Sequence, residues 1–365
     1  MRILHRYVLR EFLVPLIYCL LGFVGIYVMF EAFSSFNRIS ESSLSWTIFV
    51  AYFAGYLSPY LRYLVPAALL LAALYTMWNF CRHSELTAMR AGGIGFGAIT
   101  APLLGTAIVF SILISLSDEF YAPQASEWAQ HLRDAKFKEE DSRVFRNVPF
   151  YNRMAHRIWR VDEIDAQRPT VLKGVQISID REDGSREVDI LASRAEYLDG
   201  VWWLFEPRYR YTDKSDNAMA DPTPALSKLT VRAFPEFDET PHDFSLMNKE
   251  WGNYSVRDML RYFQTHEVMS AKEQPEKVYD IHARLAAPLS CLIITLLAIP
   301  FGIATGRQSV FRGVIGALAL FLGYNACLMG FMILAKNGLV PPRLSAWLPH
   351  GVFLALGIYF FHRQR

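Results

Sequence analysis

Charged side chains gather in one short segment of the chain, residues 82–93, which separates two long apolar stretches. Ser84 stands at a candidate helix N-cap, Glu85 falls in the first turn and Arg90 in the last turn, and a glycine pair follows. Serine caps, first-turn acids, last-turn bases and terminal glycines are the usual signals of a helix and its ends. We therefore predict a short helix across a membrane face. Because it is tied to two spanning helices, it can transmit force, which points to a transporter driven by another protein.

The sequence holds none of the common catalytic motifs. Glycine is never followed by lysine, so a nucleotide-binding P-loop is excluded, and neither His-Glu-x-x-His nor Gly-x-Ser-x-Gly occurs. The glycine-rich stretch 92–97 is similar to a phosphate-binding loop, but it follows a helix and opens an apolar segment. Flexible linkage and helix packing are the better interpretation of these glycines. We expect no catalytic residue, cofactor or metal site in this chain.

The apolar residues, 52% of the chain, come in six blocks that are nearly free of charge. Most of them reach the roughly 20 residues that cross about 30 Å of hydrocarbon. The blocks are residues 12–30, 46–80, 98–117, 285–304, 311–335 and 346–361. The second is too long for one upright span and is interrupted by Pro59 and Pro66, so we predict a membrane-surface segment and then a span from Leu61 to Phe80. We predict six transmembrane helices, three in residues 1–120 and three in residues 281–365.

Arginine and lysine residues are distributed unevenly between the two sides of these spans. Nine lie on the side of the N-terminus and four in the short loops of the other side, and cytoplasmic loops carry the excess of positive charge. The nine are Arg2, Arg6, Arg10, Arg82, Arg90, Arg307, Arg312, Arg363 and Arg365, and the four are Arg38, Arg62, Lys336 and Arg343. We therefore expect both termini and the 82–93 helix in the cytoplasm. The net charge of +2 by itself indicates little, and we expect no nucleic-acid partner.

Residues 121–280 form a polar insertion between the third and fourth spans, on the outer side. Apolar and polar residues alternate in 175–179 and 188–192, Asp183-Gly184 and Asp199-Gly200 are turn signals, and further short strands follow up to Phe237. We predict an antiparallel β-sandwich or jellyroll domain, with helices over 125–140 and 256–266 joining it to the spans. All four cysteines lie in or beside the spans, so this domain needs no disulfide.

Two other classes of protein fit parts of this pattern. A membrane-anchored external protein that binds lipid or acts as a scaffold would use the β domain and need no ATPase, although an anchor has no use for a capped helix at 82–93. An intramembrane enzyme needs ionisable residues inside its spans. The span interiors of this chain are nearly bare of such residues, which argues against that class.

Several local motifs resemble those of the LptF/LptG permeases of the lipopolysaccharide exporter. The segment 84–93 is similar to the coupling helix of that family, and Ala122-Pro123-Gln124 follows the third span as in its members. Further similar segments are residues 297–302 at the end of the fourth span, and Pro341-Pro342 with 346–349 at the start of the last. The resemblance covers essentially the whole chain. The Ala-Pro-Gln element, residues 199–202 and residues 254–258 look slightly more like LptG than LptF.

The resemblance implies a fold, a function and a set of partners. Two permeases, LptF and LptG, pair side by side, a dimer of the ATPase LptB with its ATP and Mg docks beneath them, and the small β protein LptC joins them. The spans take lipopolysaccharide from the inner membrane. Closure driven by ATP pushes the lipid into periplasmic β-jellyroll domains that lead toward the outer membrane. The chain would then be a multi-pass inner-membrane protein.

The resemblance also implies roles for particular residues. Glu85 matches the acid of the coupling helix that contacts the ATPase, and Arg82, His83 and Arg90 would help the ATPase to dock. Arg38 matches a basic position of LptG that faces lipopolysaccharide phosphates, and we expect Arg62 and Arg133 at a similar membrane level, because guanidinium groups bind phosphates bidentately. Glu31 departs from the LptG pattern, in which a base is expected nearby.

Overall fold

The computed structural model describes residues 2–36, 45–134, 144–152, 154–165, 168–212, 218–219, 230–247, 251–265, 273–304 and 310–363. The chain divides into two compact units. The first comprises Met1–Glu41, Ser45–Ser126 and Ser270–Arg365, and the second contains Glu127–Met269. Each unit is described separately below.

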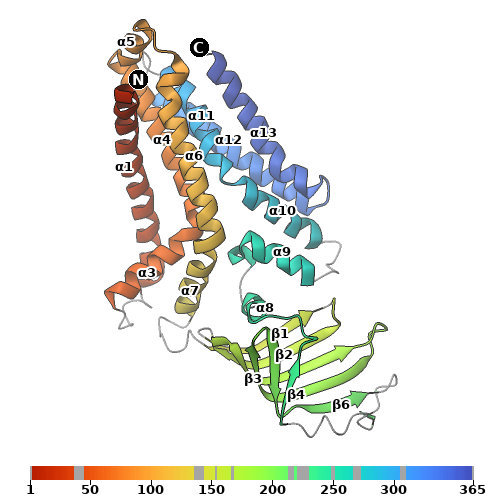
Figure 1. Cartoon of the computed structure of the whole chain (residues 1–365). Coiled ribbons are helices and arrows are strands. Elements are labelled where there is room, and N and C mark those ends of the chain that lie inside the picture. Colours follow the sequence, from red (N-terminus) through yellow and green to blue (C-terminus); the bar gives the residue numbers. More distant parts are fainter. Residues whose placement is uncertain are drawn as a thin grey trace. The chain divides into compact units, whose positions relative to one another are not determined.

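The first unit is helical throughout (Figure 1). Its elements are α1 (Arg2–Ser34), α3 (Trp46–Leu57), η1 (Ser58–Tyr60), α4 (Leu61–Arg82), α5 (Glu85–Ala91), α6 (Phe96–Leu116), the π-helical turn η2 (Ser117–Tyr121), the start of α7 (Ala122–Asp134), α10 (Glu273–Ala286), α11 (Leu289–Ala304), α12 (Val310–Lys336) and α13 (Pro342–Arg363). Among the described residues, five helices are long and apolar enough to cross a membrane, and a bent pair makes a sixth if it counts as one span. This confirms the expected membrane α-helical class.

Helix α4 begins at the residue where the sequence predicted the start of the second span. A short 3₁₀ turn at Ser58–Tyr60, with Pro59 inside it, separates α3 from α4, and α4 begins at Leu61. Helices α4 and α11 form the centre of the apolar core of this unit. Gly302 of α11 lies so close to α4 that an added Cβ would meet Met77 Cβ at 2.6 Å. A side chain at that position would therefore force the two helices apart.

The fourth expected span is broken. Helices α10 and α11 meet at an angle of 55°, at a break that contains Pro288. Proline donates no backbone hydrogen bond and ends the helix that precedes it. The Pro288 carbonyl accepts a hydrogen bond of 2.7 Å from Ser111 Oγ on α6 as well as one of 3.2 Å from Cys291 N, so a side chain of a neighbouring helix binds the backbone at the break.

The second unit is built on one antiparallel sheet. The strand order is β1-β2-β3-β4-β5-β8, and β6 pairs with β4 and with β7. The long strand β4 pairs with β5 through its second half and with β6 through its first half, so the sheet forks there. The strands are β1 (Val144–Asn152), β2 (Arg157–Asp165), β3 (Arg168–Asp180), β4 (Arg186–Leu198), β5 (Val201–Phe205), β6 (Arg208–Thr212), β7 (Ala218–Met219) and β8 (Val231–Phe234).

Turn residues and the alternation of apolar and polar residues explain the central strands. Asp199 and Gly200 have φ angles of 51° and 82° and connect β4 to β5, as an Asp-Gly hairpin requires. Ile177 and Ile190 are cross-strand partners whose side chains are both buried. The core of the sheet includes a group of large rings from Trp159, Trp202 and Phe244, with centroids 5.2–5.6 Å apart.

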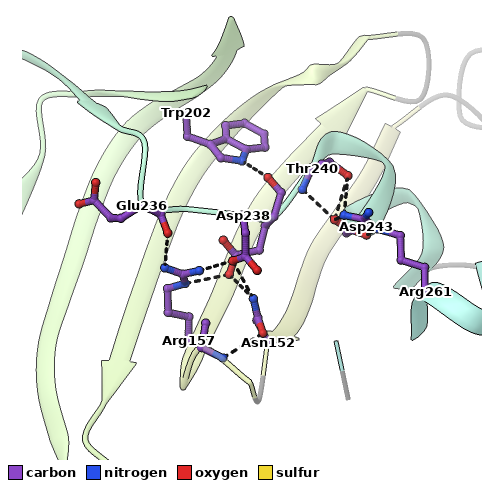
Figure 2. Close-up of polar contacts among 10 residues, drawn as sticks. Asn152, Arg157, Trp202, Glu236, Asp238, Thr240, Asp243 and Arg261 are labelled. Atoms are coloured by element: carbon purple, nitrogen blue, oxygen red, sulfur yellow. Dashed lines mark hydrogen bonds and ion pairs between the residues drawn. The ribbon is translucent and has the colours of Figure 1, made fainter. Parts of the chain in front are cut away.

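A buried ion pair attaches the chain after β8 to the sheet (Figure 2). Arg157 Nε donates to Glu239 Oε1 at 2.9 Å, and Arg157 Nη1 donates to the Glu236 carbonyl at 2.9 Å. Asn152 Nδ2 donates to the same Glu239 oxygen at 2.8 Å, and Trp202 Nε1 donates to the Glu239 carbonyl at 2.7 Å. The segment around Glu239 is therefore held by side chains of β1, β2 and β5.

Two short helices, α8 (Pro241–Met247) and α9 (Val256–Thr265), are joined by a reciprocal pair of side-chain contacts. Asp243 caps the start of α8 by accepting from Thr240 N at 2.7 Å and also binds Arg261 of α9 (Figure 2). Asp258 caps the start of α9 and lies 2.7 Å from His242 Nε2 of α8. Burial alone would raise the pKa of Asp243, but the hydrogen bonds from Arg261 and Thr240 outweigh burial and lower it.

Candidate functional site

The segment predicted to form a surface helix does so, and its end has a defined geometry. Helix α5 stops at a Schellman motif, in which Ile94 N donates to the Met89 carbonyl at 3.1 Å and Gly93 N donates to the Arg90 carbonyl at 3.0 Å. Gly93 has a φ of +80°, a conformation that favours glycine. The glycine pair therefore ends the helix, as the sequence predicted.

The other end of α5 differs from the expectation. Ser84 does occupy the N-cap position, but its φ of 59° is left-handed and its side chain makes no capping hydrogen bond. An N-cap serine that caps with its hydroxyl has an extended backbone. The prediction that the Ser84 side chain caps α5 is therefore wrong, because the tight connection from α4 holds Ser84 in a left-handed backbone conformation. Leu86 fixes this end instead, since its buried side chain belongs to the same apolar cluster as Phe80 of α4.

Glu85 has a defined partner within the first unit. Tyr7 of α1 donates a hydrogen bond of 2.8 Å from its hydroxyl to Glu85 Oε2. The Tyr7 ring also lies beside Phe80, with centroids 6.1 Å apart. Figure 1 shows the reason for this contact: α5, the start of α1 and the end of α13 lie at one end of the helical unit. Sequence reasoning missed Tyr7, which is 78 residues away from Glu85 in the chain.

The three basic residues assigned to docking surround α5 on the surface. The Arg82 guanidinium lies over the Trp78 ring, 5.1 Å from its centroid, and His83 Nδ1 lies 3.1 Å from the Asn79 carbonyl oxygen. Arg82, His83 and Arg90 all have exposed side chains. The structure thus presents one carboxylate and three basic side chains around a short rigid helix, an arrangement suited to an interface with a charged partner protein. Their docking role stays a prediction.

A second polar group lies at the opposite end of the first unit, where η1 packs against η2. Asp118 of η2 is buried and interacts electrostatically with Arg62 of α4 and Arg284 of α10, and its Oδ2 atom has no hydrogen-bond partner. Arg284 also interacts with two further acids, whereas Arg62 donates to the Pro59 carbonyl at 2.9 Å and lies over the Tyr63 ring. Arg62 is thus the guanidinium with less competition from acids. Sequence reasoning missed Arg284, although it directly precedes an apolar block.

The roles of the other two phosphate candidates stay predictions. Arg38 lies outside the described residues. Arg133 lies on the part of α7 that belongs to the second unit, so its proximity to Arg62 stays a prediction. In the part of the chain that the structure describes, no cluster of three or more His, Cys, Asp or Glu side chains could hold a metal ion.

Glu31, which departs from the LptG pattern, is buried near the end of α1. Its Oε1 atom accepts hydrogen bonds of 2.8 Å from the hydroxyl groups of Ser35 and Tyr52, and Tyr56 of α3 also hydrogen-bonds to it. Hydroxyl donors thus satisfy a buried carboxyl oxygen that has no access to water. Helix α3 therefore explains how an acid is accommodated at this position.

Comparison with known proteins agrees with this architecture. The sequence model described as the lipopolysaccharide export system permease LptF/LptG matches residues 6–363, which is nearly the whole chain. No curated protein matched the chain. The match spans both parts of the helical unit and the inserted sheet, and it does not distinguish LptF from LptG. The chain therefore belongs to the LptF/LptG family of lipopolysaccharide export permeases, multi-pass proteins of the inner membrane.

Proposed function

We propose that this chain is the transmembrane subunit of an ATP-driven exporter, in which a separate ATPase dimer docks on α5. Both termini and α5 would lie in the cytoplasm and the β domain in the periplasm. The chain would pair with a second LptF- or LptG-type permease and with an LptC-type β protein. ATP and Mg would bind to the ATPase, and the β domain would pass lipopolysaccharide on toward the outer membrane.

The rigid attachment of α5 supports this proposal. Leu86 anchors the start of α5 in the apolar core, and the Schellman motif fixes its end. Close-packed interiors transmit displacements because they have little free volume. A force applied to α5 would therefore move α4, which is packed along α11 in the centre of the helical unit.

Arg62 is the best-supported group for a lipid phosphate. It lies at the end of the unit opposite to α5, and its recorded partners are one carbonyl, one ring and the shared Asp118 carboxylate. Guanidinium groups bind phosphate through parallel hydrogen bonds. An Arg62→Gln variant is expected to bind lipopolysaccharide less tightly in nanodiscs while its ATPase complex remains intact. Arg343→Gln is the control, because Arg343 is also a basic residue near a helix start. Unchanged lipid affinity of Arg62→Gln would remove Arg62 from the site.

A charge reversal on α5 tests the proposed coupling. Glu85→Lys is expected to lower the affinity of the ATPase for the permease complex by about tenfold or more, since a repulsive contact would replace an attractive one. Thr87→Lys is the matched control, because it places the same charge on an exposed neighbouring position of α5. ATPase binding and lipid release would be measured in nanodiscs. Wild-type behaviour of Glu85→Lys would contradict the proposal, and a complex purified without any ATPase would favour the external lipid-binding or scaffold class.

A further inference from the structure

The first four turns of α1 are the part of that helix that is firmly packed. Val8, Phe12 and Leu16 recur every four residues, are each at most 1% exposed and belong to the same apolar cluster as Phe80 and Leu86. Thr76 Oγ1 of α4 is 3.3 Å from the Glu11 carbonyl and adds a polar contact. The start of α1 therefore forms one packed body with the end of α4 and with α5.

Tyr7 connects this packed body to Glu85 by a directed contact. Its ring packs beside Phe80, and its hydroxyl donates to Glu85 Oε2 at 2.8 Å. A carboxylate has two oxygens that can each accept more than one hydrogen bond. Among the described residues, the structure records no second partner for Glu85, so Oε1 is available to a donor outside the chain.

We propose that Tyr7 is a positioning residue for Glu85: its hydroxyl holds the carboxylate in one orientation, with Oε1 presented to the ATPase, and links α5 directly to α1. This inference rests on the proposed docking of an ATPase on α5. Without the hydrogen bond, the half-buried Glu85 side chain regains rotamer freedom, which must be lost again when the partner binds. Hydrogen bonds to charged groups are the stronger ones in proteins, and solvent at a partly exposed site weakens them.

The second half of α1 shows why a link between α5 and α1 through Tyr7 matters. None of the residues from Ile17 to Phe30 is buried, and the next buried side chain is Glu31, which is held by Ser35 and Tyr52. Helix α1 is thus fixed at its start and held again after Phe30, with a loosely covered stretch between. A displacement of α5 reaches α1 through Tyr7 as well as through the packing of Val8 and Phe12.

A double-mutant cycle tests the inference in the intact complex. The wild type, Tyr7→Phe, Glu85→Ala and the double variant would be reconstituted in nanodiscs with the partner permease, and ATPase affinity and lipid released per ATP hydrolysed would be measured. Tyr7→Phe keeps the ring against Phe80 and removes only the hydroxyl. We expect it to weaken ATPase binding by about 3- to 10-fold, because roughly one hydrogen bond is lost. Tyr18→Phe is the control, since Tyr18 is an exposed tyrosine on the same helix.

The double-mutant cycle distinguishes a positioning role of Tyr7 from a structural role. If Tyr7 acts through Glu85, its substitution has no further effect in the Glu85→Ala background. An equal effect in both backgrounds would show a structural role and overturn the inference. Wild-type affinity of Tyr7→Phe would also overturn it. Wild-type affinity of Glu85→Ala would instead overturn the proposed function.

Discussion

Replacement of Arg157 by methionine tests the buried ion pair that attaches the chain after β8 to the sheet. The Glu239 side chain is 0% exposed and that of Arg157 is 9% exposed. Arg157 also lies over the Phe237 ring, 4.8 Å from its centroid. Removal of one partner of a buried ion pair costs about 3–5 kcal/mol, because the remaining charge has no compensation. We expect Arg157→Met to destabilise the second unit by that amount.

Hydrogen exchange in the full-length protein would measure this effect. Amides of β2 to β5 that exchange through global opening of the sheet should lose protection by between about 100-fold and several thousand-fold, because each 1.4 kcal/mol is about tenfold. Arg160→Met is the matched control, since Arg160 is an exposed arginine on the same strand. Adding Glu239→Gln to Arg157→Met should restore part of the protection, because it removes the uncompensated charge.

The pH dependence of Arg157→Met follows from the same pair. Burial raises the pKa of the Glu239 carboxyl, and Arg157 and Asn152 oppose that rise. Without Arg157 the carboxyl protonates more readily, so the deficit in protection should shrink as the pH falls. A deficit below about 1 kcal/mol, or one that does not change with pH or with Glu239→Gln, would refute the assignment of a buried and compensated charge.

Three further predictions concern other positions. Gly93→Ala should weaken ATPase binding to the permease, because a left-handed residue other than glycine costs about 1 kcal/mol; Gly95→Ala, at a φ of −64°, should leave the affinity unchanged. Gly302→Ala should lower the unfolding temperature of the helical unit, since its Cβ would meet Met77, whereas Gly323→Ala, with open space around it, should not. The pKa of Asp243 is lowered in the folded state, so its contribution to stability is present above its unfolded pKa of about 3.9 and is lost as the pH falls through the folded value. Asp243→Asn should therefore make the acid unfolding curve of the second unit flatter. An unchanged curve would contradict this.

Short sequence motifs predicted the elements that depend only on residues close together in the chain. The hairpin at Asp199-Gly200 follows from the turn geometry of that dipeptide, and the end of α5 follows from its glycine pair. The expectations did not include strands β1 and β2, although Trp159, Val161 and Val148 have the buried positions of an alternating pattern. Charged residues stand between these positions and hid the alternation in the sequence.

Contacts between distant segments account for what the sequence did not predict about the site. Glu85 was identified from its place in a helix, but its partner Tyr7 depends on how α1 packs against α4. Arg62 was identified from its level in the second span, whereas Arg284 joins Asp118 only because α10 ends beside η2. Ser84 was correctly placed at the N-cap position, but its residue type did not reveal the left-handed backbone that accompanies the missing side-chain cap.

The contact between Ser111 and Pro288 has a consequence for the evolution of this chain. The Ser111 hydroxyl gives the Pro288 carbonyl a second hydrogen bond, beside the one of 3.2 Å that Cys291 N donates, and it ties α6 to the chain at the break between α10 and α11. This contact depends on the break, because the break sets where the carbonyl of residue 288 lies beside α6. The two positions should therefore change together among homologues, although 177 residues separate them in the sequence.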